Sequence, residues 1–348
     1  MKDFKKHLIV RGSLIKEALT RLDELGQDAI LFVVDEKDTL IGALTDGDVR
    51  RGLLNNIQIS ESIDHIIQHN PRFIRKGERD INKIIEYREG LYRIIPILNE
   101  ENIVIKIINF RENKSYLPID AVIMAGGRGQ RLMPLTKDIP KPLLIVGDKP
   151  IIEHNINRLA LFGVDNFWIS INYLGDLIEN RFGDGSNRNI NINYIREVEP
   201  LGTIGAVSKV ASFLHEYVLI TNSDILTNLN YEQFFLDFVK SNADLGVVTI
   251  PYDVNIPYAV LEINDAWVKS FKEKPTYTYY SNGGIYLLKK QILKYIPDET
   301  FFNATDLIER LLKENKLIYS YPLMDYWLDV GSHDDFKKAQ HDINNINF

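Results

Sequence analysis

The chain has 348 residues, of which 45% are hydrophobic and 26% are charged, with a formal net charge of −7. This balance indicates a soluble globular protein with two ordinary domains or one large one. The acidic charge disfavours nucleic-acid binding, and the absence of cysteine excludes disulfides, thiolate metal sites and cysteine nucleophiles. No segment approaches the roughly 18 apolar residues that a membrane span needs, so we expect a cytoplasmic protein without a membrane or nucleic-acid partner.

The first third of the chain carries a partly repeated order of elements. A helix is expected over Ile15–Leu25, followed by strands over Ile30–Val34 and Leu40–Leu44 and a helix from Asp48 to Leu54. A similar order returns after Ser60, which predicts two diverged copies of one small α+β unit. The second copy is expected to contain Ile63–Ile67, a helix over Ile81–Tyr87, and strands over Arg93–Leu98 and Ile103–Ile108.

A polar segment, Glu112–Pro118, reads as a linker to a second domain of a different kind. Ile119–Met124 is nearly all apolar, as expected for a buried parallel strand, and strand and helix patterns then alternate. This alternation predicts an α/β, doubly wound, mostly parallel (Rossmann-like) sheet, whose ligands lie at the carboxyl ends of the strands. Helices are expected over 151–162, 174–182 and 203–213, and strands over 167–171, 190–195 and 217–221.

A glycine-rich segment follows the first strand of this sheet directly. Glycines let the backbone approach an anion closely, and exposed N–H groups can hold phosphates. Arg131 adds a permanently charged fork, and Lys141 follows between two prolines that stiffen its backbone. The candidate nucleotide-binding residues of the loop are Ala125, Gly126, Gly127 and Gly129.

Other interpretations of the glycine-rich segment stay open at this point. It could be a plain tight turn. An NAD-linked dehydrogenase fits poorly, because Arg131 stands where the third glycine of a dinucleotide-binding motif belongs. A Walker-type loop is excluded, since no Gly-Lys-Ser/Thr follows.

Two aspartates are candidate metal ligands. Asp224 follows an apolar strand, and Asp329 lies in the segment Trp327–Gly331. Mg²⁺ prefers carboxylate and phosphate oxygens, so these two side chains and a substrate phosphate suit it. Each aspartate taken alone could equally be a helix cap or a turn residue.

The ordered pattern from Gly126 to Leu143 resembles the motif of the sugar-1-phosphate nucleotidyltransferases. The resemblance implies that Arg131 and Lys141 hold the triphosphate and that Asp224 and Asp329 bind Mg²⁺. It further implies catalytic roles for Arg131, Lys141, Asp224, Lys274 and Asp329, with Lys274 anchoring the sugar phosphate. The sugar-binding residues implied in the same way are Asp224, Glu273, Asn282 and Gly284.

The segment Glu199–Thr203 resembles the guanylyl branch of this family and adds Glu199 and Gly202 to the nucleotide-binding residues. A carboxylate only accepts hydrogen bonds, and guanine offers two adjacent donors on its Watson–Crick edge. GTP is therefore the expected nucleotide, with Glu197 as the rival position to Glu199. A carboxylate that only favours a helix N-terminus is the alternative.

The segment Leu40–Arg51 resembles the end of a CBS (cystathionine β-synthase type) motif. The resemblance implies that Thr45 and Asp48 bind an adenine-nucleotide effector, and that the chain forms a homo-oligomer through its CBS pair. The second copy, Val104–Asn109, lacks these two residues. An N-cap at Asp48 is the alternative.

Together these patterns predict a CBS pair over residues 1–114 and a transferase domain over residues 118–348. The expected reaction joins a nucleoside triphosphate to a sugar 1-phosphate and releases pyrophosphate. The domain order resembles the glucosamine-1-phosphate guanylyltransferases of legionaminic acid biosynthesis. A mannose or heptose 1-phosphate guanylyltransferase, a uridylyl- or thymidylyltransferase, and a catalytically inactive nucleotide sensor are the alternatives.

Overall fold

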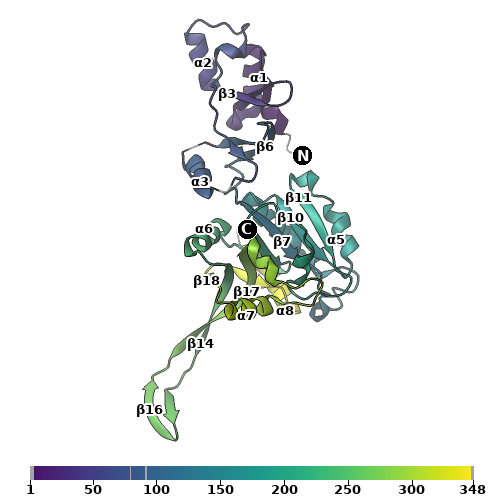
Figure 1. The fold of residues 1–348 in the computed structure, drawn as a ribbon, viewed down its shortest axis with the longest axis vertical. Helices are drawn as coiled ribbons and strands as arrows, with labels where there is room; N and C mark the ends of the chain where they lie inside the picture. Colours follow the sequence, from purple (N-terminus) through teal and green to yellow (C-terminus); the bar gives the residue numbers. More distant parts are fainter. Residues whose placement is uncertain (1–3, 79, 91, 346–348) are drawn as a thin grey trace. The chain divides into compact units, whose positions relative to one another are not determined.

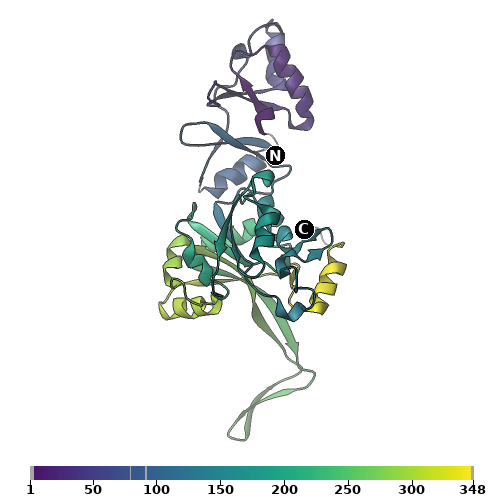
Figure 2. The ribbon, with the colours of Figure 1, turned by 90° about the vertical axis from the view of Figure 1, so that its right-hand side faces the viewer.

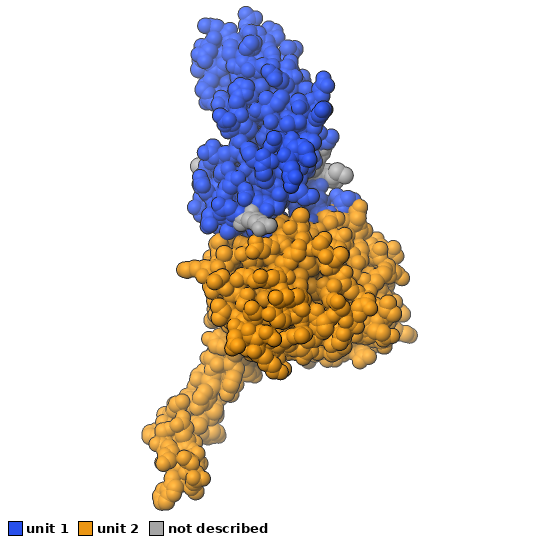
Figure 3. Space-filling model, in the orientation of Figure 1, with its two compact units in different colours: residues 1–118, 160–165, 186–190 blue, residues 119–159, 166–185, 191–348 orange. Residues whose placement is uncertain are grey.

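The computed structural model describes residues 4–78, 80–90 and 92–345; the outermost residues of both predicted domains, 1–3 and 346–348, lie outside it. The chain forms two compact units (Figure 3). Unit 1 comprises residues 1–118, 160–165 and 186–190, and unit 2 comprises the remainder. Within the described ranges, no helix is both long and apolar enough to cross a bilayer.

Unit 1 contains two small sheets with the same topology. In each, the first strand is parallel to the second, and the second is antiparallel to the third. This is the arrangement expected of two diverged copies of one unit. Shared core residues, among them Phe32, Ala43 and Leu98, belong to one apolar cluster that spans both halves. The elements are β1 (Leu8–Val10), α1 (Ile15–Leu25), β2 (Ile30–Val34), β3 (Leu40–Thr45), α2 (Asp46–Leu54), β4 (Ile74–Arg75), α3 (Ile81–Glu89), β5 (Ile94–Leu98) and β6 (Val104–Asn109).

Unit 2 is built on a seven-stranded sheet with the order β11-β10-β7-β12-β17-β14-β18 (Figures 1 and 2). Its first four strands are parallel, and β17 is antiparallel to both of its neighbours. The predicted doubly wound, mostly parallel sheet is therefore confirmed. The strands are β7 (Ile119–Met124), β10 (Asn166–Ile171), β11 (Asn191–Arg196), β12 (Tyr217–Asn222), β14 (Leu245–Asn255), β17 (Thr276–Lys289) and β18 (Ile318–Pro322).

The central strands are buried on both faces, which explains their continuous apolar runs. In β12, four consecutive residues are buried, and they alternate between the two faces of the sheet. Val218 and Ile220 pack into a cluster with Leu307 and Leu311 of a covering helix. The helices of unit 2 are α4 (Ile151–Leu161), α5 (Gly175–Phe182), α6 (Tyr231–Ser241), α7 (Ala304–Lys313) and α8 (His333–Asp342).

One predicted helix is wrong. Where a helix was expected over residues 203–213, the structure has only a short 3₁₀ helix, η7 (Gly205–Lys209). Gly202 has a φ of +79°, and a Cβ on Gly205 would come within 2.6 Å of the Thr300 carbonyl oxygen. The segment follows the adjacent 300–302 backbone instead of coiling, because tertiary packing overrides helical periodicity here.

Three antiparallel strand pairs complete unit 2 and were not predicted. β8 (Ile145–Val146) pairs with β9 (Lys149–Pro150). β13 (Ile225–Thr227) pairs with β19 (Trp327–Asp329). The far ends of β14 and β17, together with β15 (Val260–Asn264) and β16 (Trp267–Lys272), form a long two-stranded extension of unit 2 (Figures 1 and 2). We call the segment Tyr252–Tyr280 the arm.

Candidate active site

The carboxyl ends of two neighbouring parallel strands bring the main candidate segments together. β7 and β12 are paired in register, with Met124 opposite Asn222. The glycine-rich loop leaves β7, and the segment Ser223–Asp224 leaves β12 at the same edge. This is the edge at which doubly wound sheets bind ligands.

Asp224 and Asp329 lie side by side because β13 and β19 are paired. Ile225 stands opposite Asp329 in that ladder, and the Val330 N–H donates to the Asp224 carbonyl at 3.0 Å. The Lys141 ammonium forms an ion pair with the Asp224 carboxylate and lies 3.9 Å from Asp329 Oδ1. The structure therefore brings together three of the predicted catalytic residues.

The two carboxylates form a strained electrostatic pair. Burial and, after it, the neighbouring Asp224 carboxylate raise the pKa of Asp329 to about 6, against the opposing effect of Lys141 and Arg131. A second negative charge is costly here, and a cation that shares both carboxylates relieves the repulsion.

The aspartate pair fits a hard divalent cation. Within the described residues, Oδ1 of Asp224 and Oδ1 of Asp329 are buried and accept no hydrogen bond. The same residues contain no group of three or more His, Cys, Asp or Glu side chains placed to hold a metal. A cation here would take the rest of its ligands from phosphate oxygens and water, as Mg²⁺ commonly does.

The glycine-rich loop is folded against this pair. Gly129 is left-handed, with φ of +63°, and its carbonyl accepts from Thr136 Oγ1 at 2.9 Å. A Cβ at Gly129 would approach the Lys141 Cβ to 3.0 Å, so the glycine lets the loop lie on the lysine segment. The Arg131 guanidinium lies next to Gly331, where a Cβ would be 3.3 Å from either terminal nitrogen.

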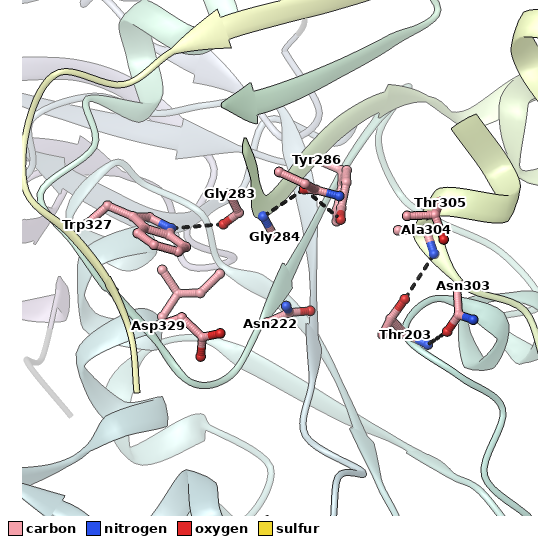
Figure 4. Close-up of a pocket in the computed structure, with 12 residues that line it drawn as sticks. Thr203, Asn222, Gly283, Gly284, Tyr286, Asn303, Ala304, Thr305, Trp327 and Asp329 are labelled. Atoms are coloured by element: carbon pink, nitrogen blue, oxygen red, sulfur yellow. Dashed lines mark hydrogen bonds between the residues drawn. The ribbon is translucent and has the colours of Figure 1, made fainter. Parts of the chain in front are cut away.

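A cavity of about 290 Å³ opens beside Asp329 (Figure 4). Asn282 lines it, and its Oδ1 accepts from the Gly284 N–H at 3.0 Å and from the Tyr286 hydroxyl at 2.9 Å. Gly284 has φ of +70°, and a Cβ there would come within 2.8 Å of Asn222 Nδ2. The structure thus places Asn282 and Gly284, two of the predicted sugar-binding residues, in one cavity with Asp329.

Five further residues of the cavity were missed by sequence reasoning. Asn222 directly follows a predicted strand, so the strand-end rule could have found it. Of the others, two lie in segments that the sequence singled out without assigning a role to these side chains, Glu199–Thr203 and Trp327–Gly331, and two lie at the start of α7, which carries no recognisable pattern. They are Thr203, Asn303, Thr305 and Trp327.

The two candidate base contacts differ in their surroundings. Glu197 is buried, and its carboxylate accepts from the Leu201 N–H at 2.9 Å and from the Ser170 hydroxyl. Glu199 is exposed and makes no hydrogen bond or ion pair among the described residues. Gly202 packs tightly, since a Cβ there would lie 2.6 Å from the Phe302 carbonyl oxygen.

The remaining four predicted residues are not among those that line this cavity. Glu273 and Lys274 are exposed on the arm and do not line it. Thr45 and Asp48 are in unit 1, where they form a capping box at the start of α2. Asp48 also accepts from Gln68 Nε2 at 2.9 Å and forms an ion pair with Arg51.

Comparison with known proteins agrees with this architecture. Residues 120–346 match the nucleotidyl transferase family. A heptose 1-phosphate guanylyltransferase (D-glycero-alpha-D-manno-heptose) of Aneurinibacillus thermoaerophilus is 32% identical over 228 residues, which cover 65% of this chain and 98% of that protein. A mannose-1-phosphate guanylyltransferase of Mycobacterium tuberculosis is 30% identical over 234 residues, and the match spans only 64% of its length and 65% of this chain.

Solved structures match the same part of the chain. HddC from Yersinia pseudotuberculosis, complexed with GMP-PN, has a TM-score of 0.50 and 27% identity, covering 64% of this chain and 99% of that one. A glucose-1-phosphate thymidylyltransferase from Bacillus anthracis, described as putative, has a TM-score of 0.53 over 66% of this chain and 97% of that one, and at 23% identity it shows the fold alone. With the family match covering most of its length, the chain belongs to the nucleotidyl transferase family.

Proposed function

We propose that this protein transfers a nucleotidyl group from a nucleoside triphosphate, GTP in preference, to a sugar 1-phosphate, glucosamine 1-phosphate in preference, and releases pyrophosphate. The observation that carries the proposal is the junction of Lys141, Asp224 and Asp329 at the carboxyl edge of the sheet, beside the glycine-rich loop. The products serve surface-glycan or nonulosonic acid synthesis.

The reaction needs charge neutralisation more than proton transfer. An oxygen of the sugar phosphate attacks the α-phosphorus of the triphosphate, and the bond from that phosphorus to the bridging oxygen of the pyrophosphate breaks. The attacking oxygen is already anionic, so no general base is required, and positioning and electrostatics supply the acceleration. Arg131 and Lys141 hold the triphosphate and balance charge on the leaving pyrophosphate, while Lys274 anchors the incoming phosphate.

Asp224 and Asp329 would hold Mg²⁺ through their unpaired Oδ1 atoms. The cation, when bound, supplies Lewis-acid stabilisation of phosphate charge. The cavity beside Asp329 accommodates the sugar, with Asn282 held in place by its bonds to Gly284 and Tyr286.

The base preference rests on Glu199. Its carboxylate makes no hydrogen bond among the described residues, and Glu199 lies three residues before Gly202. Both carboxylate oxygens of Glu197, by contrast, accept hydrogen bonds from the protein. The guanylyltransferase names of two relatives and the guanine nucleotide bound in one similar structure support GTP.

We expect Glu199→Gln to lower the ratio of kcat/KM for GTP over UTP by about tenfold or more. Glu309→Gln, on an exposed face of α7, is the matched control; an unchanged ratio in Glu199→Gln would remove Glu199 from the base site.

The whole proposal is tested by a substrate screen. Purified protein with Mg²⁺ is given GTP, UTP, dTTP or CTP together with glucosamine, mannose, heptose or glucose 1-phosphate, and pyrophosphate release is measured. We expect the fastest release with GTP. No release in any combination would contradict the proposal and favour an inactive nucleotide sensor.

Regulation by an adenine nucleotide in unit 1 is a second part of the proposal. It rests on the resemblance of Leu40–Arg51 to a CBS motif and on a cavity of about 240 Å³ lined from both halves of the unit, by Leu40 and Asn102 among others. We expect AMP, ADP or ATP to raise the Tm and to change turnover, and CBS pairing to produce a homo-oligomer. Calorimetric titration with each nucleotide tests the binding.

A further inference from the structure

The arm has no packed interior of its own. None of residues 251–282 is buried, although β14 and β17 run from it directly into the sheet of unit 2 (Figures 1 and 3). Its outer part is a two-stranded sheet of β15 and β16 alone. An isolated two-stranded ribbon is marginally stable in water.

The two faces of the arm are chemically different, because residues alternate along each strand. Where the arm joins the sheet of unit 2, Tyr252 is opposite Tyr279, and Val254 is opposite Tyr277, on one face. The other face pairs polar groups, with Thr278 Oγ1 donating to Asp253 at 2.8 Å and Thr276 Oγ1 donating to Asn255 at 2.6 Å.

The same division continues in the outer part. Leu261 is opposite Phe271, and Ile263 is opposite Val268 beyond a bulge; their exposed fractions range from 51% to 66%. On the other face Glu262 forms an ion pair with Lys272. The charged and hydroxyl groups of this second face are thus paired within the arm, although the face also carries the exposed Trp267 and Tyr280. The first, apolar face is left uncovered, which in soluble proteins marks an interaction surface.

Glu273 and Lys274 lie within this arm, between β16 and β17. Lys274 has a φ of +42°, an uncommon backbone state for a residue other than glycine, and it makes no hydrogen bond or ion pair within the described ranges. Residues held in uncommon backbone states cluster at active sites and ligand contacts.

Lys274 cannot reach the cavity of its own chain in this arrangement. β17 is continuous from Thr276 to Lys289, and the six residue-to-residue steps from Thr276 to Asn282 span about 20 Å of extended strand. That is well beyond the length of a lysine side chain. The cavity itself lacks a cation, since Asp329 is the one charged residue among its 12 lining residues.

We propose that the arm of one chain lies with its apolar face on a second copy of the chain and delivers Lys274 to that copy's cavity, so that each active site contains residues of two chains. The charges complement each other, because the cavity is proposed to take a sugar phosphate and the arm presents a free ammonium. A two-fold arrangement forms the same contact twice and buries both arms. This inference rests on the proposed function.

Complementation between two defective chains tests it. Lys274→Ala leaves the cavity intact and damages the arm; Asp224→Ala does the reverse. The two are co-expressed with different tags, and mixed assemblies are isolated by affinity to both tags. We expect each variant alone to lose roughly a hundredfold in turnover. The mixed dimer should regain about half of the native turnover, because one of its two sites combines an intact cavity with an intact arm.

A mixture of Asp224→Ala with Asp329→Ala is the matched control and should regain nothing, since both changes damage the aspartate pair and neither chain supplies an intact one. Mixed dimers that stay inactive, or a failure to recover any mixed assembly, would overturn the proposal, as would near-native turnover of Lys274→Ala alone.

Cross-linking gives a readout independent of activity. The chain has no cysteine, so Glu273→Cys and Thr305→Cys each introduce a single thiol. Mixed and treated with a short bismaleimide, the two variants should give a covalent product of two chains. If the arm bends onto its own cavity instead, only the double variant links, and it does so within one chain. If the cross-linked product of two chains forms but the wild-type protein has no transferase activity, the proposed reaction is contradicted and the proposed contact of the arm is supported.

Discussion

At the scale of single residues, the aspartate pair decides how the site behaves. Asp224 and Asp329 come from distant segments, and the β13–β19 ladder holds them together with one lysine between them. Asp329 has a pKa of about 6, raised by burial and by Asp224. The folded protein therefore binds this proton more tightly than the unfolded chain does.

The first prediction concerns pH. The contribution of Asp329 to stability is present below about pH 4 and is lost as pH rises through 6, because the charged form is disfavoured only in the folded state. We expect Asp329→Asn to raise the Tm of the metal-free protein at pH 7.5 and to change it little at pH 4. The variant should also lose the Tm increase that Mg²⁺ gives the native chain. Asp334→Asn, at a fully exposed position, is the control, and equal Tm changes at both pH values would contradict the assignment.

The second prediction concerns turnover. We expect Arg131→Ala and Asp224→Ala each to lower kcat by about a hundredfold or more, because each removes a charge from the proposed phosphate site. The fold should survive, as judged by circular dichroism. Lys337→Ala removes a positive charge from the exposed side of α8 and should keep native kcat. Near-normal rates in both site variants would show that the reaction occurs elsewhere.

The sequence alone predicts some of the candidate active-site residues and misses the position of others. Asp224 and the glycines follow strands directly, so the strand-end rule locates them. Asp329 could be predicted only from the family resemblance. The short β13–β19 ladder that brings it next to Asp224 leaves no periodic pattern in the sequence. Glu197 and Glu199 both follow the end of β11 and are two residues apart. The sequence could not show that Glu197 is the buried one, because tertiary packing decides this.

At the scale of elements, periodicity gave most helices and strands within a residue or two, as in α1, β2 and β7. It failed over residues 203–213, where Gly202 and Gly205 pack against the 300–302 backbone. It also could not foresee the arm, because an alternating strand pattern does not say whether the alternate face meets a core or another chain.

The third prediction tests the packing of Gly202 against the backbone that precedes α7. Gly202→Ala would add a Cβ 2.6 Å from the Phe302 carbonyl oxygen at a φ of +79°. We expect a loss of about 1–3 kcal/mol of stability, from backbone strain and displacement of the 302 segment. Gly127→Ala is the matched control, since nothing lies within 4 Å of its Cβ position. Urea unfolding of both variants provides the measurement; similar midpoints would contradict the packing argument.

At the scale of the whole molecule, the chain does not divide into two consecutive domains. Residues 160–165 and 186–190 belong to unit 1, although they lie between strands of unit 2 in sequence. Within unit 1, the Lys106 ammonium is 2.8 Å from the Asp165 carboxylate, and the Leu117 N–H donates to the Phe162 carbonyl at 3.0 Å. A Cβ on Gly163 would lie 2.5 Å from the Tyr116 Cα, so the two backbones are in close contact.

The fourth prediction follows from these contacts. A transferase fragment that begins at Ile119 should be less stable than one that begins at Asn113, because it exposes the Phe162 segment and loses buried Tyr116 and Leu117. Each fully buried side chain of this size contributes on the order of 1.5–3 kcal/mol. Thermal unfolding of both fragments tests the difference; equal Tm values would mean that residues 113–118 contribute nothing there.

The interleaving of the two units also limits how such a protein could arise or be re-engineered. A recombination event at residue 118 would transfer most of unit 1 and leave two of its segments, 160–165 and 186–190, behind in the donor. Grafting this N-terminal region onto another transferase therefore requires matching surface at two internal loops, including a glycine equivalent to Gly163. Unit 1 therefore cannot be transferred alone by a single exchange at its C-terminal boundary, and we expect its descent to follow that of unit 2.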